Sequence, residues 1–200
     1  MEWVTTTQVL EGLKESNDTI AWTSFRDHFY PVIFNFAKTL GLSETDAEDA
    51  AQETMLAFLK AFRDGKYIRE KGHLSHWLFG VARRTILDFR RRLPREHFVA
   101  DRTGTSFWGM LADEDSARRT WDTEWRYMVL ERCLQQARRQ LDQKVFKAFE
   151  LYALLQKPLE EVCQTLGMSR NAVYIAKSRV LSKLRQLQHD FEGFSDGSIL

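Results

Sequence analysis

Apolar residues recur every three or four positions in three stretches of the first half of the chain. This is the spacing of one face of an α-helix, so we predict helices over 22–40, 44–63 and 73–93. The positions expected to face a core are Trp22, Phe25, Phe29, Ile33, Phe36, Leu40, Ala47, Ala51, Met55, Phe58, Leu59, Phe62, Leu74, Trp77, Leu78, Val81, Ala82, Phe89 and Leu93.

Turn-forming residues separate these stretches. Gly41 is expected to end the first helix and Ser43 to cap the second, while Pro31 is expected to bend or restart the first. Residues 64–72 form a loop in this interpretation, and Pro94 ends the third helix.

Residues 94–122 have no sustained periodicity, and we interpret them as a linker. Its aromatic residues are Phe107, Trp108 and Trp121. They suit a segment that docks on another surface, but a mobile linker with incidental aromatics explains them equally well. Further helices are expected near 123–140 and 142–156, and the tail from 190 is expected to fray.

The segment 157–185 has the outline of a helix-turn-helix. Pro158 suits the first position of a short helix, Gly167 suits its left-handed end, and Ser169 suits the cap of a second helix. At about 100° per residue the second helix buries one stripe, made of Val173, Ala176, Val180, Leu184 and Leu187. Its outward face carries Arg170, Asn171, Tyr174, Ile175, Ser178, Arg179 and Ser182, with Lys183 and Arg185 placed for phosphates. Such a helix can enter the DNA major groove, although a helical hairpin with a solvated basic face stays open.

The predicted fold is therefore all-α, with two small helical domains and a flexible linker. The expected limits are 1–94 and 123–189 for the domains, 95–122 for the linker and 190–200 for the tail. No strand-like alternation and no internal repeat is found in the sequence.

Composition indicates a globular chain, since 44% of its 200 residues are hydrophobic and 28% are charged. The net charge of +1 does not by itself suggest nucleic acid, but the charges are segregated: 44–53 is acidic, whereas 83–95 and most of 138–185 are basic. Cys133 and Cys163 are isolated and are expected to be buried thiols. No apolar run is long enough for membrane insertion, and Glu2 argues against a signal peptide, so a cytoplasmic location is expected.

Acidic residues gather on the outward side of the 44–63 helix. Asp46, Asp49 and Glu53 share this side with Leu56, and Gln52 lies on its flank. An acidic stripe around an exposed leucine suits docking on a basic protein surface. A solvated outer face explains the same spacing, so both interpretations stay open here.

Cationic residues gather on the outward side of the 73–93 helix and in the loop before it: Arg69, Lys71, His73, His76, Arg83, Arg84, Arg90 and Arg91. Arginines on one helical face form a plausible phosphate-binding surface. Tyr67, Trp77 and Phe79 could stack on unpaired bases, although Trp77 also falls on the inward stripe, where a core role is favoured.

Together these segments resemble a bacterial extracytoplasmic-function (ECF) sigma factor, the minimal class of the sigma-70 family. The resemblance covers about residues 20–94 and 123–188. The polymerase-binding segment of the family is matched by Trp22…Phe29-Tyr-Pro31 and Asp46-Ala-Glu-Asp-Ala-Ala-Gln-Glu53. The helix that melts and reads the −10 element is matched by His76-Trp-Leu-Phe-Gly-Val-Ala-Arg-Arg-Thr-Ile-Leu-Asp-Phe-Arg-Arg91, and the −35-reading part by the terminal helix-turn-helix. The combination of the three is specific, whereas none of them would be specific alone.

The resemblance implies a non-enzymatic protein without a metal or cofactor, whose partners are core RNA polymerase and promoter DNA. Polymerase contacts would fall to Asp46, Asp49, Gln52, Glu53 and Leu56. The −10 element would be read by the cationic set of 69–91, and the −35 element by Arg170, Asn171, Tyr174, Ile175, Ser178, Arg179 and Lys183. Members of the class are often held inactive by an anti-sigma factor, and they lack the third domain of larger sigma factors.

The chain departs from the family pattern at two places. Arg84 stands where asparagine is common, and Ala172-Val-Tyr-Ile-Ala176 replaces the usual opening of the recognition helix. Base-specific reading at Arg84 is therefore an open point, and Tyr174 and Ile175 predict an unusual −35 preference.

Two other classes of function were weighed. A stand-alone helix-turn-helix regulator would use the first predicted domain, residues 1–94, for dimerisation and would need an apolar patch on its outward side. A metal-dependent hydrolase would need Asp46, Asp49 and Glu53 beside histidines, but His73 and His76 fall in a different, basic helix.

Overall fold

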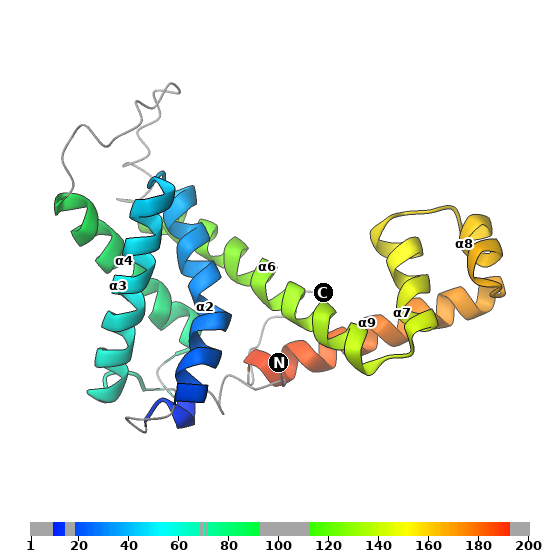
Figure 1. Cartoon of the computed structure of the whole chain (residues 1–200), viewed down its shortest axis with the longest axis horizontal. Coiled ribbons are helices and arrows are strands. Elements are labelled where there is room, and N and C mark those ends of the chain that lie inside the picture. Colours follow the sequence, from blue (N-terminus) through cyan, green and yellow to red (C-terminus); the bar gives the residue numbers. More distant parts are fainter. Residues whose placement is uncertain (1–9, 15–18, 69, 71, 93–112, 193–200) are drawn as a thin grey trace. The chain divides into compact units, whose positions relative to one another are not determined.

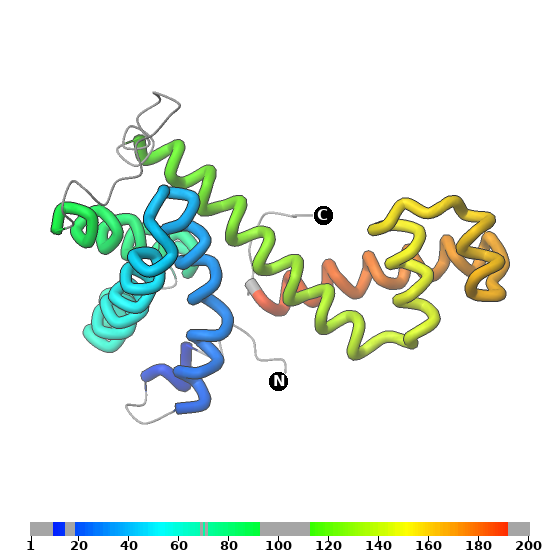
Figure 2. Tube along the Cα trace, turned by 45° about the horizontal axis from the view of Figure 1, so that its top comes forward, coloured from blue at the N-terminus to red at the C-terminus, as the bar shows by residue number. Residues whose placement is uncertain are grey.

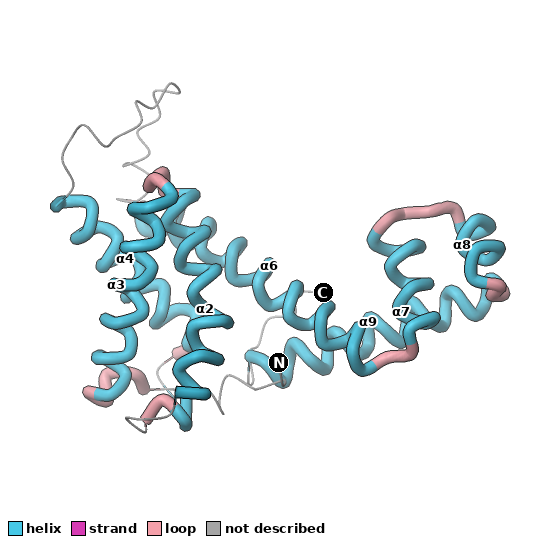
Figure 3. Tube along the Cα trace, in the orientation of Figure 1, coloured by secondary structure: helices cyan, strands magenta, loops and turns pink. Residues whose placement is uncertain are grey.

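The computed structural model describes residues 10–14, 19–68, 70, 72–92 and 113–192 (Figure 1). Within these residues the regular elements are all helices, and no strand is found among them (Figure 3). The all-α class predicted from the sequence is confirmed for this part of the chain.

Three helices form the first bundle. α2 (Thr19–Thr39), α3 (Glu44–Arg63) and α4 (Leu74–Arg92) lie side by side, and α3 packs against both of the others (Figure 1, Figure 2). Aromatic rings fill the space between them: the rings of Phe25 and Phe58 stack with centroids 4.4 Å apart. Most of the predicted inward positions are buried, whereas Trp22, Leu59, Trp77 and Val81 are half-buried at the margin of the bundle. The predicted inward Leu93 lies outside the described residues.

The connections of this bundle follow the local chemistry. Gly41 adopts a positive φ of 79° after α2, a conformation that glycine reaches without steric cost. Ser43 then caps α3, because its Oγ accepts a hydrogen bond from the Asp46 N–H at 3.1 Å. The predicted restart at Pro31 does not occur: Pro31 lies inside α2 with its ring exposed, and the helix continues through it.

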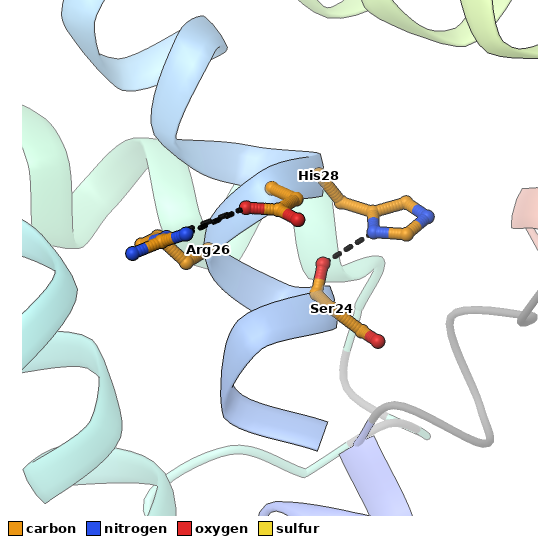
Figure 4. A network of polar contacts seen from close by, with 4 residues as sticks. Ser24, Arg26 and His28 are labelled. Carbon is orange, nitrogen blue, oxygen red and sulfur yellow. Dashed lines mark hydrogen bonds and ion pairs between the residues drawn. The ribbon is translucent and has the colours of Figure 1, made fainter. Parts of the chain in front are cut away.

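One buried polar side chain of α2 is satisfied within its own helix. His28 is 4% exposed, and its Nδ1 contacts the backbone carbonyl of Ser24, one turn earlier (Figure 4). Because a carbonyl oxygen only accepts, Nδ1 carries the proton of this contact. Near the same turn Arg26 pairs with its neighbour Asp27 at 3.1 Å (Figure 4).

The next described element, α6 (Glu114–Gln140), begins earlier than the sequence predicted. Residues 114–122, expected to belong to the linker, form its first turns. Trp121 is fully buried, its ring lies 5.3 Å from Phe36 in an edge-to-face arrangement, and Trp125 stacks on Phe29 at 5.5 Å. The docking alternative is therefore confirmed for Trp121, whereas Phe107 and Trp108 lie outside the described residues.

The remaining elements form a second bundle. They are α7 (Gln143–Phe149), the π-helical turn η3 (Glu150–Leu154), α8 (Leu159–Leu166) and α9 (Arg170–Glu192) (Figure 1). α7 and α8 both pack on α9. The single helix expected near 142–156 is thus an α-helix that widens into a π-turn, and Asp142 caps it by accepting from the N–H groups of Lys144 and Val145.

The predicted helix-turn-helix is present as α8 and α9. Gly167 ends α8 in the left-handed conformation, with φ 56° and ψ 48°, and the Ser169 Oγ accepts from the Ala172 N–H at 3.2 Å to cap α9. Pro158 is the N-cap of α8 rather than its first helical residue. Cys133 is buried as expected, but Cys163 on α8 is half-buried.

The described residues separate into two compact units, one ending at Met128 and the other beginning at Val129. The first unit contains α2, α3, α4 and the first half of α6. The second contains the rest of α6 with α7, η3, α8 and α9. The predicted 95–122 linker limits stay a prediction, since most of that stretch lies outside the described residues.

Candidate functional site

The acidic side of α3 contains residues in two different states. Asp46 and Glu53 are held by neighbours: the Ser43 Oγ donates to Asp46 Oδ2 at 2.7 Å, and Glu53 pairs with Arg92 at the end of α4. Asp49 and Gln52 are exposed, and Leu56 presents 62% of its surface to solvent. The exposed part of this surface is therefore Asp49, Gln52 and Leu56.

A groove of about 470 Å³ runs beside these residues, between α2 and α3. Its lining residues are Trp22, Arg26, Tyr30, Gln52, Met55 and Leu56. Burial and the nearby Glu48 and Asp49 carboxylates raise the pKa of Tyr30, so its hydroxyl stays protonated as a hydrogen-bond donor. Sequence reasoning did not assign Arg26 to this surface, because the approach of α2 to α3 is a tertiary contact. Tyr30 falls within residues 22–31, which the family resemblance had already linked to polymerase binding.

The cationic residues of α4 also differ in environment. Arg84 and Arg91 are exposed, and Arg91 Nη1 pairs with Asp88 at 3.0 Å on its own helix. Arg90 is half-buried, and burial lowers its pKa to about 10, which leaves it charged at neutral pH. Arg83 is mostly covered, with 23% of its side chain exposed and the Glu114 carboxylate 3.8 Å away.

The two histidines at the start of α4 are at the surface: His73 directly precedes the helix, and His76 lies in its first turn. His73 and His76 are exposed, and their rings meet edge to face at 5.9 Å. Burial and the neighbouring Arg118 lower the pKa of His76, against the opposing effect of Asp122, so the ring is mainly neutral at pH 7. Arg69 and Lys71 lie outside the described residues.

The first half of α6 covers one side of α4. The Trp121 Nε1–H donates to the Ser75 Oγ at 3.0 Å, and the Arg118 guanidinium lies 5.4 Å from the ring centre of Phe79. With the Glu114–Arg83 pair, these contacts run along one face of α4 and leave Arg84 and Arg91 exposed. The run of acidic residues 113–115 is a sequence signal for the start of α6. The Asp113 side chain accepts a hydrogen bond from the Asp115 N–H at 3.3 Å, and the acidic residues of the first turn complement the positive end of the helix dipole.

The aromatic residues considered for base stacking are mainly structural. Phe79 is buried, and Trp77 is half-buried with its ring 4.9 Å from Phe58 and 5.1 Å from Tyr67. The core interpretation of Trp77 is therefore supported by its packing. Tyr67 is half-buried at the end of this aromatic row.

In the second unit, α9 has sharply different sides. Val173, Ala176, Val180, Leu184 and Leu187 are each at most 2% exposed, as the sequence predicted. Every predicted reading residue on the opposite side is exposed except Lys183, which is half-buried and donates to Gln186 Oε1 at 3.2 Å: the exposed ones are Arg170, Asn171, Tyr174, Ile175, Ser178 and Arg179.

The start of α9 is fastened to the elements before it. The Arg170 guanidinium pairs with the Glu160 carboxylate of α8 at 2.6 Å, and the Tyr174 ring meets Tyr152 of η3 edge to face at 5.8 Å. Interaction with the neighbouring Tyr152 hydroxyl raises the pKa of Tyr174, and Lys177 Nζ lies 5.6 Å from the Tyr152 ring centre. The role of Tyr152 was not predicted, because nothing in its local sequence marks it.

The described part of the chain contains neither a cluster of metal-ligating side chains nor a helix suited to a membrane. No group of three or more His, Cys, Asp or Glu side chains is close enough to hold a metal ion among those residues. No described helix combines the length and apolar character needed to cross a membrane.

Comparison with known families assigns both units. The family model described as sigma-70 region 2 matches residues 25–96, and the model described as sigma-70, region 4 matches residues 131–184. Together the two matches cover more than half of the 200 residues. No curated protein matches the chain. The chain therefore belongs to the sigma-70 family, with the two regions typical of ECF sigma factors, and is a non-catalytic RNA polymerase subunit that directs promoter recognition and transcription initiation.

Proposed function

We propose that three separate surfaces divide the work of this sigma factor. The acidic side of α3 binds core RNA polymerase, the cationic side of α4 engages the −10 element, and the outward side of α9 reads the −35 element. The observation that carries this proposal is the division of α9 into a fully buried apolar stripe and an exposed polar face. The match of residues 131–184 to sigma-70 region 4 favours this interpretation over a helical hairpin whose outer face is only solvated.

The polymerase contact is supported by the mixture of charge and apolar surface on α3. Exposed Asp49 and Gln52 adjoin Leu56 and the neighbouring groove, which suits a basic partner surface with an apolar centre. Asp46 and Glu53 belong to the proposed site as well, but each already has a partner within the chain. A charge reversal at Glu53 would also set an arginine against Arg92, so Asp49 is the better residue to test.

The −10 contact is supported by the exposure of Arg84 and Arg91. Both guanidinium groups are exposed, that of Arg91 being paired with Asp88, and we assign Arg84 to a phosphate or a base edge. The same proposed surface includes the half-buried Arg83 and Arg90 and the exposed His73 and His76. Arg69 and Lys71 are assigned to it through the family resemblance alone.

The −35 contact uses the outward face of α9 that begins at Arg170. Asn171 is suited to hydrogen bonding with an adenine, and Arg179 and Lys183 are suited to bases or phosphates further along the groove. Tyr174, Ile175 and Ser178 complete the set. We infer that the protein acts in the cytoplasm, where polymerase and promoter DNA are found, and that an anti-sigma factor would compete with core polymerase for one of these surfaces.

Reconstitution with core polymerase tests the proposal against a stand-alone helix-turn-helix regulator. The full chain, with and without core polymerase, is mixed with duplex fragments selected from a random pool, and permanganate detects unpaired thymines. We expect selection and melting only with core polymerase, and loss of both for Asp49→Arg. Glu131→Arg, the same charge change at an exposed position of α6, is the matched control and should behave as wild type. Tight operator binding by the chain alone, without polymerase association, would instead identify a stand-alone regulator.

A further inference from the structure

The outward face of α9 contains an apolar side chain where a groove-reading helix would meet base edges. Ile175 is 50% exposed, and it follows Asn171 by four residues, so the two share one side of the helix one turn apart. Ser178 and Arg179 are the next exposed residues along the helix. Ile175 is therefore an apolar group within a set of hydrogen-bonding groups.

We propose that Ile175 is a specificity-determining residue that contacts the C5-methyl group of a thymine and so selects an A·T base pair within the −35 element. The inference rests on the proposed reading of that element by α9. In the major groove only thymine presents an apolar group, whereas the other base edges present hydrogen-bond donors and acceptors. An isoleucine packed on one of those edges would remove water from a polar atom without replacing its hydrogen bond.

The turn of α9 before Ile175 contacts the neighbouring elements. Arg170 pairs with Glu160 of α8, and the Tyr174 ring meets that of Tyr152 in η3. Tyr174 is therefore directed toward η3, although it is also 50% exposed. Both Tyr174 and Ile175 neighbour Asn171 on the helix surface, but we assign the base edge to Ile175 because the Tyr174 ring packs on Tyr152.

An exposed leucine of the same unit provides a control for non-specific apolar contact with DNA. Leu155 is 59% exposed in the second unit, but it lies just after η3 and not on the recognition helix. If exposed apolar surface in this unit acted only through non-specific contact with DNA, Leu155 and Ile175 would behave alike. If Ile175 reads a methyl group, only Ile175 should respond to removal of that group.

The test removes one methyl group from the DNA at a time. Holoenzyme formed from the full chain and core polymerase first selects duplexes from a random pool, and each thymine of the enriched upstream motif is then replaced by deoxyuridine. We expect one such replacement to weaken wild-type binding about fourfold, the effect of removing one buried carbon group. Ile175→Ala should bind the thymine and deoxyuridine duplexes equally, while Leu155→Ala should keep the wild-type difference.

Each other outcome overturns a defined part of the reasoning. If no upstream motif is enriched, the proposed reading of the −35 element fails, and this inference fails with it. If a motif is enriched but no deoxyuridine matters, or Ile175→Ala keeps the full difference, the −35 assignment stands and the methyl contact is refuted. If the difference disappears in Tyr174→Ala but persists in Ile175→Ala, the methyl group is read by Tyr174 instead.

Discussion

Replacing Trp121 with alanine is the strongest test of how the first unit is built. Trp121 lies in the part of α6 that the sequence assigned to a linker, yet its side chain is fully buried. Its ring contacts Phe36 at 5.3 Å and Phe79 at 6.0 Å, and its Nε1–H donates to the Ser75 Oγ at 3.0 Å. The substitution therefore removes the anchor that joins α6 to α2 and α4.

The expected cost follows from this burial. Truncation of a buried tryptophan to alanine typically costs about 3–5 kcal/mol, and the lost hydrogen bond to Ser75 places this site toward the upper end. A domain of this size has a total stability of roughly 5–15 kcal/mol, so the first unit would lose a large fraction of it. Its melting temperature should fall by roughly 15–30 °C.

Circular dichroism of the full-length chain during heating measures the effect, because helix content reports both units. We expect Trp121→Ala to lower the transition of the first unit and to leave that of the second unit unchanged. Tyr127→Ala is the matched control, since Tyr127 lies on the same helix but is 67% exposed and should cost less than about 0.5 kcal/mol. A loss below about 1 kcal/mol for Trp121→Ala would show that α6 is not part of the first unit's core.

Four further predictions concern single residues of the described surfaces and turns. Asp49→Arg should weaken binding to core polymerase at least tenfold (roughly 1.4 kcal/mol or more) in fluorescence anisotropy at moderate salt, because it places like charge against a basic surface. Unchanged affinity would refute the α3 contact. Arg84→Ala should reduce open-complex formation more than closed-complex binding in permanganate footprinting, whereas equal losses would indicate a general phosphate contact. Lys183→Ala should weaken promoter binding uniformly across sequences and lower the salt slope by about one unit, and a changed sequence preference would contradict this. Gly167→Ala should lower the free energy of unfolding by about 1 kcal/mol in thermal unfolding, because a φ of 56° is strained for residues other than glycine. Gly80→Ala inside α4 should instead raise the free energy of unfolding by about 0.5–1 kcal/mol, and at both positions the added Cβ has no atom within 4 Å.

The sequence determined the elements whose signals are local. Helical spacing of apolar residues identified α2, α3, α4 and the buried stripe of α9, and the chemistry of Ser43, Gly167 and Ser169 located the turns. These features depend on residues within a few positions of one another, so they can be read before any packing is known. The family resemblance combined such local motifs, and the two regional matches confirm it.

Tertiary structure decided which residues of each surface are available. Helical spacing alone had placed Glu53 and Arg83 on the same exposed surfaces as their neighbours. In the structure Glu53 forms an ion pair with Arg92, and Arg83 is mostly buried next to Glu114. The same is true of Trp121, whose burial depends on rings supplied by α2 and α4. Helical periodicity states which side of a helix is polar, but it does not state which other helix approaches that side. Contacts between residues far apart in the chain therefore had to come from the fold.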